Sequence, residues 1–182
     1  MRVDKKEIEL FNQRDPRFFR ELVDRYQVSI LNVCLAYTHN RDEASDLTQE
    51  VFIQAFRSAS EFRGDSSIKT WLTRIAIHKS LNFLRKSKRI TSTELSEANH
   101  PSFSPDSSDS QLLQSEQNKW FYRALDALPE KQREAFILHK LEENSYQEVA
   151  EIMGTSVSAV ESLMHRAKVN LRALLEKVLD RG

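Results

Sequence analysis

The sequence predicts an all-α protein, with two small helical domains joined by a flexible acidic linker. Apolar residues recur at three- and four-residue spacing through most of the chain, as on the buried face of an amphipathic helix. Three glycines and four prolines are few for a sheet protein, which needs many turns. The periodicity is lost only in a stretch rich in Ser, Asp and Pro, which has too few large apolar groups to fold. We therefore place the domains at residues 1–90 and 116–182 and the linker at residues 91–115.

Charge follows the same division, although the net charge of the chain is zero. Residues 1–90 hold 17 Lys and Arg against 12 Asp and Glu, residues 91–118 hold five acids and no base, and residues 119–182 hold ten of each. No apolar run is long enough to span a bilayer, and the N-terminus lacks the apolar core of a signal peptide. The single cysteine, Cys34, lies among apolar residues, which indicates a core thiol. We expect a cytoplasmic protein without direct membrane insertion.

The first domain is expected to begin with a short helix at residues 4–14. Asp15 then caps a second helix whose first residue is Pro16, a position where the missing amide hydrogen costs nothing. A separate, largely apolar helix is expected at about residues 28–37, followed by a turn and a helix at residues 43–58.

The helix at residues 43–58 has an acidic side opposite its apolar side. This side and the turn before it carry Asp42, Asp46, Gln49 and Glu50. Like charges four residues apart on a helix repel each other by a few tenths of a kcal/mol. The residues alone leave two interpretations open, a solvated acidic face and a docking surface for a basic partner.

A polar loop at residues 61–67 leads into a helix from about residue 68 to residue 86. The basic end of this helix suits a helix C-terminus on electrostatic grounds alone. Basic groups interleaved with aromatic side chains also suit nucleic acid, because cations track phosphates and aromatic rings stack on unpaired bases. Trp71, taken by itself, fits a core position better than a ligand site.

In the second domain, Leu128-Pro129 separates a helix that begins near residue 116 from a helix at residues 130–141. The second of these is expected to turn Phe136, Ile137 and Leu141 inward.

Residues 145–175 then have the spacing of a helix-turn-helix. Ser145 and Glu148 form a capping-box pattern, Gly154 suits the turn, and Ser156 can cap the next helix. The outer face of that helix carries Ser158, Glu161, Ser162, His165, Arg166 and Lys168. Such a face can enter a major groove. The alternative is a plain helical hairpin with a solvated polar face.

The sequence holds no set of residues typical of an enzyme. Phosphate-binding glycine loops are absent, and the five histidines have no metal-binding spacing with each other or with Cys34. The carboxylates fall on polar helix faces or in the linker. We therefore expect no catalytic residue, no metal and no cofactor, and a nucleic-acid-processing enzyme has no support.

Two blocks of sequence resemble the bacterial sigma-70 family. DEASDLTQEVFIQAF at residues 42–56 and FRGDSSIKTWLTRIAIHKSLNFLRKSKR at residues 62–89 are similar to region 2 of these sigma factors. LPEKQREAFILHKLEENSYQEVAEIMGTSVSAVESLMHRAKVNLRALLE at residues 128–176 is similar to region 4. Two domains, a short linker and no region 1.1 or full region 3 resemble the extracytoplasmic-function (ECF) group most. The resemblance implies a non-enzymatic initiation factor that brings core RNA polymerase to promoter DNA.

The resemblance also implies a role for each surface. The acidic face of Asp42, Asp46, Gln49 and Glu50 would dock on the beta-prime clamp helices, and region 4 would meet the beta flap. Recognition and melting of the minus-ten element would involve Phe62, Arg63, Gly64, Asp65, Ser66, Trp71, Asn82, Arg85 and Lys86. The minus-thirty-five element would be read by Ser158, Glu161, Ser162, His165, Arg166 and Lys168. The linker would thread the active-site and RNA-exit channel, and an anti-sigma factor would cover the polymerase-binding faces.

Three positions depart from the family pattern. Glu161 and Leu163 stand where basic residues are frequent, and His78 stands where asparagine is frequent. Glu161 can accept a hydrogen bond from a cytosine amino group, but it repels phosphate. The alternative function is a helix-turn-helix regulator that binds an operator without polymerase.

Overall fold

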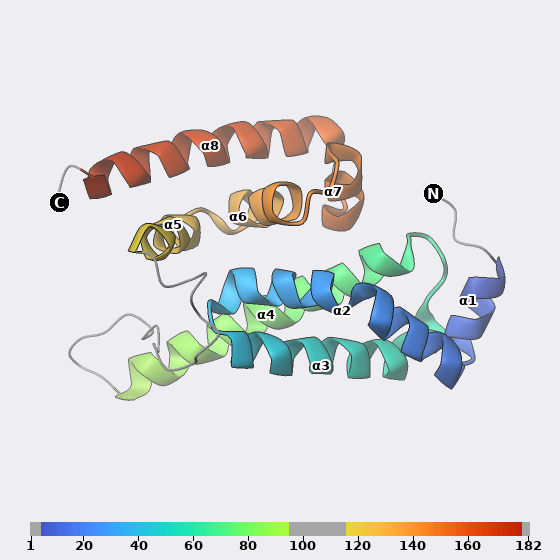
Figure 1. Ribbon diagram of the computed structural model, residues 1–182. Coiled ribbons are helices and arrows are strands. Elements are labelled where there is room, and N and C mark those ends of the chain that lie inside the picture. Colours follow the sequence, from blue (N-terminus) through green and yellow to red (C-terminus); the bar gives the residue numbers. More distant parts are fainter. Residues whose placement is uncertain (1–4, 95–115, 180–182) are drawn as a thin grey trace.

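The computed structural model describes residues 5–94 and 116–179 (Figure 1). These residues form helices and short helical turns, with no strand among them, which confirms the all-α prediction. Residues 91–94, which we assigned to the linker, continue the helix before it. Extending a formed helix by one residue is far easier than starting one, so a polar composition does not by itself end a helix. The rest of the expected linker, residues 95–115, lies outside the described residues.

The N-terminal half, residues 5–94, is a bundle in which three long helices pack on one another and a short helix crosses one end (Figure 1). Its elements are α1 (Lys5–Asn12), α2 (Pro16–Thr38), α3 (Arg41–Ser58), the 3-10 turn η1 (Ala59–Glu61) and α4 (Ile68–Glu94). The Asp15 carboxylate accepts hydrogen bonds from the amides of Arg17 and Phe18, at 3.0 and 2.9 Å, as expected for a cap. Asn40 caps α3 in the same way.

The two helices expected at residues 16–26 and 28–37 are one helix, α2, so this prediction was wrong. No glycine or proline lies between Pro16 and Thr38 to break the backbone ladder. Leu22, Ile30 and Val33 are all buried along the same helix. Val28, where we expected a new helix to begin, is therefore an exposed hydrophobic residue within a continuous helix.

The C-terminal half, residues 116–179, consists of four helices, with α8 along its outer edge and α7 at one end (Figure 1). Its elements are α5 (Glu116–Asp126), α6 (Glu130–Phe136), the π-turn η3 (Ile137–Leu141), α7 (Tyr146–Met153) and α8 (Val157–Leu179). Ile137 is buried as expected, but Leu141 is exposed and Leu138 is fully buried in its place. The wider π-turn shifts the apolar register, which a strict 3.6-residue period does not anticipate.

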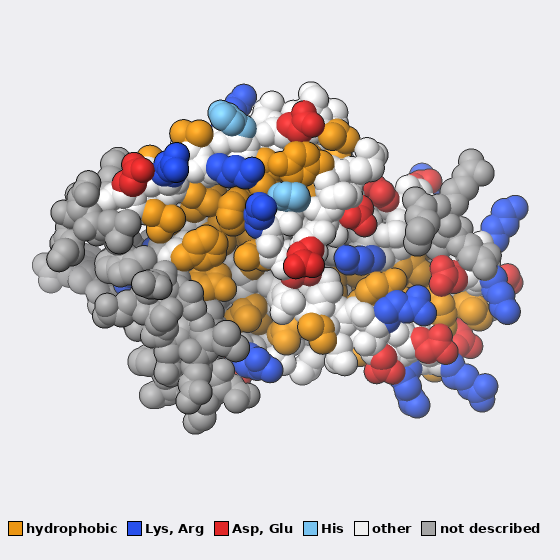
Figure 2. All heavy atoms as spheres, turned by 45° about the horizontal axis from the view of Figure 1, so that its top comes forward, with side chains coloured by type: hydrophobic (Ala, Val, Ile, Leu, Met, Phe, Trp, Pro, Cys, Tyr) orange, Lys and Arg blue, Asp and Glu red, His pale blue; other side chains and the backbone are white. Residues whose placement is uncertain are grey.

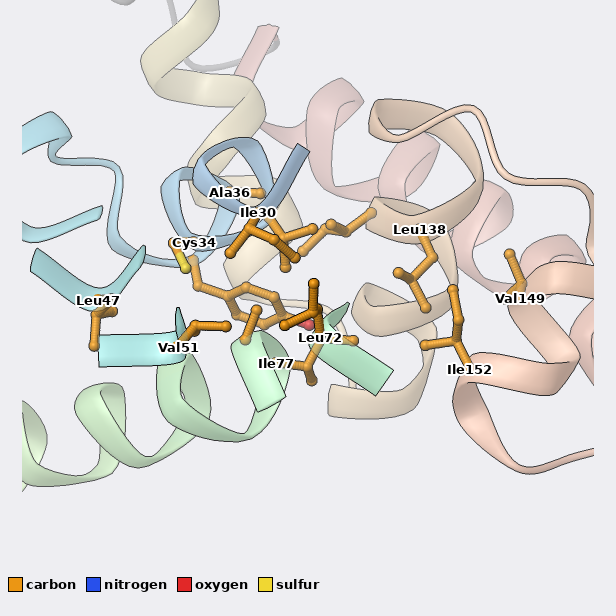
Figure 3. Packing of buried hydrophobic residues seen from close by; sticks show 14 of the residues in the cluster. Ile30, Cys34, Ala36, Leu47, Val51, Leu72, Ile77, Leu138, Val149 and Ile152 are labelled. Atoms are coloured by element: carbon orange, nitrogen blue, oxygen red, sulfur yellow. The ribbon is translucent and has the colours of Figure 1, made fainter. Parts of the chain in front are cut away.

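The two halves pack against each other through apolar side chains. Figure 3 shows Leu138 and Ile152 of the C-terminal half beside Leu72 and Ile77 of α4, with Ile30 of α2 nearby. All five side chains are at most 5% exposed. Burying such groups stabilises the contact by roughly 25 cal/mol for each Å² of apolar surface removed from water.

Polar groups cross the same boundary between the halves. The Arg74 guanidinium of α4 donates to the backbone oxygens of Glu151 and Ile152 at the end of α7, the second at 2.9 Å. These oxygens belong to the last turn of a helix, where carbonyls lack helical partners. The Ser29 hydroxyl of α2 donates to the Glu142 carboxylate at 2.7 Å. We call this set of contacts, together with the apolar cluster, the interdomain contact.

The interdomain contact is expected to depend on pH through Glu142. Burial raises the pKa of this carboxyl above its ordinary value of 4.5, against smaller opposing effects of Ser29 and Lys69. Because the packed form then holds the proton more tightly than the separated form, packing should weaken as pH rises from about 4.5 through the raised pKa, and then level off. Glu142→Gln should abolish this dependence and favour packing at neutral pH, measured as energy transfer between dyes on the two halves.

The exposed neighbour Glu143 offers a matched control for that measurement. Glu143→Gln should shift the pH profile of energy transfer only slightly, because the Glu143 charge is the smallest of the causes that act on the pKa of Glu142. An unchanged profile in Glu142→Gln would show that another group controls the packing.

Candidate nucleic-acid and partner interfaces

The acidic face lies on α3, where Asp42, Asp46, Gln49 and Glu50 are all exposed. They share one side of the helix because three- and four-residue steps return to the same face. The Glu50 carboxylate accepts from the Lys79 ammonium of α4 at 2.7 Å, so part of its charge is already compensated. No hydrogen bond or ion pair joins the Asp46 carboxylate to another of the described side chains.

An apolar groove of about 260 Å³ between α2 and α3 adjoins this face. Gln49 belongs to both the groove and the acidic face, and Leu31, Thr48 and Phe52 are among the other lining residues. At its rim Val28 is 64% exposed and extends the apolar surface of the groove toward solvent. A surface with an apolar groove beside carboxylates suits a helix that carries both apolar and basic side chains.

The loop at residues 62–67 joins η1 to α4 and contains Gly64 in the left-handed region, at φ 74°. Glycine adopts this conformation without a steric penalty. The side chains of Arg63 and Asp65 are exposed, whereas Phe62 and Ser66 are buried. Ser67 caps α4, since its hydroxyl oxygen accepts from the Thr70 amide at 2.9 Å. The cap and the left-handed glycine give this short connection a defined backbone.

Phe62 and Trp71 belong to a cluster of aromatic rings beneath the loop. The Phe11 ring lies 5.2 Å from the Phe62 ring and 5.4 Å from Trp71 between centroids, both edge to face. It also stacks on Phe19 at 5.0 Å. Such edge-to-face pairs stabilise beyond their buried area, by about 0.5–1.5 kcal/mol each. Phe62 is 4% exposed, whereas Trp71 is only half-buried, so only the Trp71 ring presents a substantial surface to solvent.

Farther along α4, polar and basic side chains lie near the contact with the C-terminal half. Asn82 is within 3.3 Å of the His78 ring, one turn earlier, and Arg85 donates to the Asn82 side-chain oxygen at 3.4 Å. Arg85 also pairs with Glu130 of α6, at 3.5 Å. Arg85 and Lys86 are both exposed. An exposed ion pair such as Arg85–Glu130 contributes little stability, about 0–1 kcal/mol, so this arginine exchanges partners readily.

The helix-turn-helix prediction is confirmed at each local signal. Ser145 and Glu148 form the capping box, and the hydrogen bonds to Ser145 hold the pKa of the Glu148 carboxyl below its ordinary value. Gly154 ends α7 in the left-handed conformation, at φ 62°. The Ser156 hydroxyl oxygen accepts from the Ala159 amide at 3.2 Å and caps α8. The loop between the helices therefore has the conformation that its sequence predicts.

The outer face of α8 carries an exposed polar set of side chains: Ser158, Glu161, Ser162, His165, Arg166 and Lys168. Figure 2 turns this side of the molecule forward and shows Lys, Arg and His side chains above hydrophobic ones. Met164 and Ala167 of the same helix are buried on the opposite side. Leu163, which stands where basic residues are frequent in the family, is half-buried against the core and lies off the outer face. The outer face therefore has the shape and the polarity of a groove-reading helix.

Three further observations concern metal binding, membrane crossing and thiol chemistry. Among residues 5–94 and 116–179, no group of three His, Cys, Asp or Glu side chains is placed to hold a metal ion. Within the same residues, no helix has both the length and the hydropathy that crossing a membrane requires. Cys34 is fully buried, and burial raises the pKa of its thiol. A buried thiol of raised pKa is a poor nucleophile.

Arg14 and Glu142, which the patterns did not single out, make tertiary contacts, and so does Arg74, which the sequence placed among the basic groups of a segment suited to nucleic acid. Each bonds to a group at least 42 residues away in the chain. Sequence periodicity reports only on neighbours within a helix, so it carries no signal for such pairs.

Comparison with known families matches both halves of the chain. The family described as Sigma-70 region 2 matches residues 22–90, and the family described as Sigma-70, region 4 matches residues 118–171. The chain is 33% identical over 184 residues to the RNA polymerase sigma-H factor of Pseudomonas aeruginosa, covering 97% of this chain and 95% of that one. It is 32% identical over 174 residues to the ECF RNA polymerase sigma-E factor of Escherichia coli K12, covering 91% of each.

Solved structures have a similar fold. CnrH, in complex with the cytosolic domain of CnrY, superposes with a TM-score of 0.69 at 23% identity, covering 96% of this chain and 97% of CnrH. The sigma factor RpoE of Bartonella quintana, in complex with the anti-sigma factor NepR, superposes with a TM-score of 0.63 at 26% identity, covering 87% and 96%.

Proposed function

The chain belongs to the bacterial sigma-70 family as an extracytoplasmic-function (ECF) sigma factor, and on that premise we propose that it carries core RNA polymerase to specific promoters and melts them. The observation that carries the proposal is the presence of both family regions, in order, in a chain that spans 95% of a named sigma factor. The protein would act as an initiation factor without enzymatic activity, in the cytoplasm. Its functional units would be residues 1–90, a linker at residues 91–115, and residues 116–182.

The acidic face and the groove beside it are proposed to bind the beta-prime clamp helices of the polymerase. Asp46 and Gln49 are exposed, and among residues 5–94 and 116–179 no ion pair involves Asp46, which leaves both side chains available to basic and polar groups of a partner. The groove would provide apolar surface for the partner to bury. The carboxylates would orient a basic partner and raise its rate of association. On the C-terminal half, the half-buried rings of Phe121 and Phe136, 6.2 Å apart, are proposed to contribute to the surface for the beta flap.

The loop at residues 62–67 and α4 are proposed to bind the minus-ten element as single-stranded DNA. The half-buried Trp71 ring and the exposed Arg63 suit base stacking and phosphate contacts. Asn82 provides an amide that can read a base edge, while Arg85 and Lys86 provide phosphate contacts. Phe62 and Ser66 are buried, so we assign them to support of the loop.

The outer face of α8 is proposed to read the minus-thirty-five element in the major groove. Arg166 and Lys168 suit phosphates, whereas Ser162 and Glu161 suit base edges. An anti-sigma factor that covers the polymerase-binding faces is proposed as the regulator. The solved structures of CnrH and RpoE, each in complex with a second protein, support this class of partner.

Run-off transcription tests the proposed function. Core polymerase together with the protein should yield discrete transcripts from genomic DNA fragments, with start sites that share upstream elements, and neither component alone should do so. Tight, specific binding of the protein alone to duplex DNA, without transcripts, would instead identify an operator-binding regulator.

A further inference from the structure

The helix α1 lies outside residues 22–90, the part of the chain that matches region 2, yet it packs directly on η1 (Figure 1). The turn η1 leads into the loop at residues 62–67, which carries the proposed minus-ten site. Three side chains from residues 5–14 make these contacts, namely Ile8, Phe11 and Arg14. Each reaches a different part of the connection between α3 and α4.

Arg14 holds the end of α3 and the start of the connection. Its guanidinium donates to the backbone oxygens of Phe56 and Arg57, both at 2.8 Å, and lies 3.4 Å from the Ser60 hydroxyl. The two oxygens belong to the last turn of α3, where carbonyls lack helical partners. The planar guanidinium of an arginine can donate to both carbonyl oxygens at once, whereas a lysine ammonium does so poorly.

The backbone of Arg14 is itself unusual, because it lies in the left-handed region at φ 56°. A side chain with a Cβ atom adopts this conformation at a steric cost, and glycine is the residue that usually occupies it. The sequence thus keeps an arginine where the backbone favours glycine. The three contacts of the guanidinium offset the steric cost of the left-handed backbone at Arg14.

Ile8 and Phe11 hold the loop and its base. The Ile8 side chain fills the space where a Cβ atom of Gly64 would lie, so it covers the loop at its left-handed residue. Phe11 is fully buried and contacts both Phe62, the first residue of the loop, and Trp71, near the start of α4. One short helix therefore contacts the start and the middle of the loop and the beginning of the helix that follows it.

We propose that α1, together with Arg14 in the turn that follows it, is a positioning element of the minus-ten site, which holds the loop at residues 62–67 ready to receive an extruded promoter base. The proposal rests on the proposed function of that loop. A flexible loop loses conformational entropy when it binds single-stranded DNA, and a loop already held in the bound shape loses less. The positioning residues are Arg14, Ile8 and Phe11, none of which needs to touch DNA.

The test uses holoenzyme assembled from core polymerase and full-length variants. Arg14→Ala should weaken binding of a single-stranded minus-ten oligonucleotide by about five- to tenfold and slow promoter melting by a similar factor, as expected when a preorganised loop is loosened. Affinity for core polymerase and binding of the upstream duplex should stay within about twofold of wild type. The acidic face occupies residues 42–50 of α3, away from the end of the helix that Arg14 contacts, and the upstream duplex is read by α8. Arg17→Ala, an exposed arginine of α2 nearby, is the matched control and should behave as wild type.

Arg14→Gly separates positioning from stability. Glycine suits φ 56°, so this variant removes the guanidinium while relieving the backbone, and its melting temperature should be at or above that of Arg14→Ala. The oligonucleotide affinity should nevertheless fall as in Arg14→Ala. Arg14→Lys should recover only part of it.

The outcomes are distinct from those of the proposed function. Wild-type oligonucleotide affinity in both Arg14→Ala and Arg14→Gly would overturn the positioning role. A loss that follows the melting temperature across the variants, with Arg14→Gly restored to wild type, would also overturn it. Failure of the proposed function would appear earlier, as an absence of transcripts with the wild-type protein.

Discussion

Asp46→Lys is expected to weaken binding of the protein to core RNA polymerase by about tenfold or more, because like charges facing each other across an interface cost several kcal/mol. Asp46 is exposed on the side of α3 that also carries Gln49 and Glu50, beside the apolar groove. A basic partner that approaches this face would meet the new ammonium directly. The thermal stability of the protein should hardly change, because an exposed helix position tolerates lysine well.

Binding is measured by titration of labelled protein with core polymerase, at two salt concentrations. The loss should shrink as salt rises, because screening weakens contacts between exposed charges. Glu176→Lys is the matched control, since it makes the same charge reversal at an exposed position of α8 far along the chain. Equal affinity of wild type and Asp46→Lys would exclude the acidic face from polymerase binding.

Arg166→Ala is expected to weaken binding of the upstream promoter duplex by about tenfold, the loss of about 1.4 kcal/mol that one good contact supplies. Arg166 is exposed on the outer face of α8, on the same helix as the buried Met164 and Ala167 that hold the helix in place. If its guanidinium contacts a phosphate, the slope of log affinity against log salt should fall in magnitude by about one.

The control for this variant is Arg172→Ala, which removes an exposed arginine farther along the same helix. It should leave both the affinity and the salt slope near their wild-type values. A salt slope in Arg166→Ala identical to wild type, with lower affinity for one sequence only, would assign Arg166 to a base edge. Unchanged affinity would remove it from the interface.

The local elements of the second domain could be predicted almost residue by residue. Ser145, Glu148 and Gly154 act on backbone groups within four residues of themselves, so their chemistry is fully present in the sequence. Two predictions failed where the local signal was ambiguous. The expected break in α2 was wrong because no residue enforces it, and the inward assignment of Leu141 was wrong because a π-turn changes the register.

The candidate sites could be predicted as sets of residues, but their geometry could not. The outer face of α8 follows from helical spacing, and its six polar side chains are exposed as expected. The residues predicted for the minus-ten site differ in exposure, because Phe62 is buried while Arg63 beside it is exposed. Phe62 is turned inward because its ring packs against the ring of Phe11, which lies 51 positions earlier in the chain.

By itself, the sequence determined the helical class of this sigma factor, the order of its two regions and the local caps of its helix-turn-helix. Those features depend on hydrophobic periodicity and on hydrogen bonds between near neighbours in the chain. Only the tertiary structure decided that Arg74 and Ser29 of the N-terminal half meet the C-terminal half, and that Arg14 clamps the end of α3. An apolar face shows that a helix must pack against another element, but the shapes of the side chains determine which one. The polar contacts between distant residues depend on that packing.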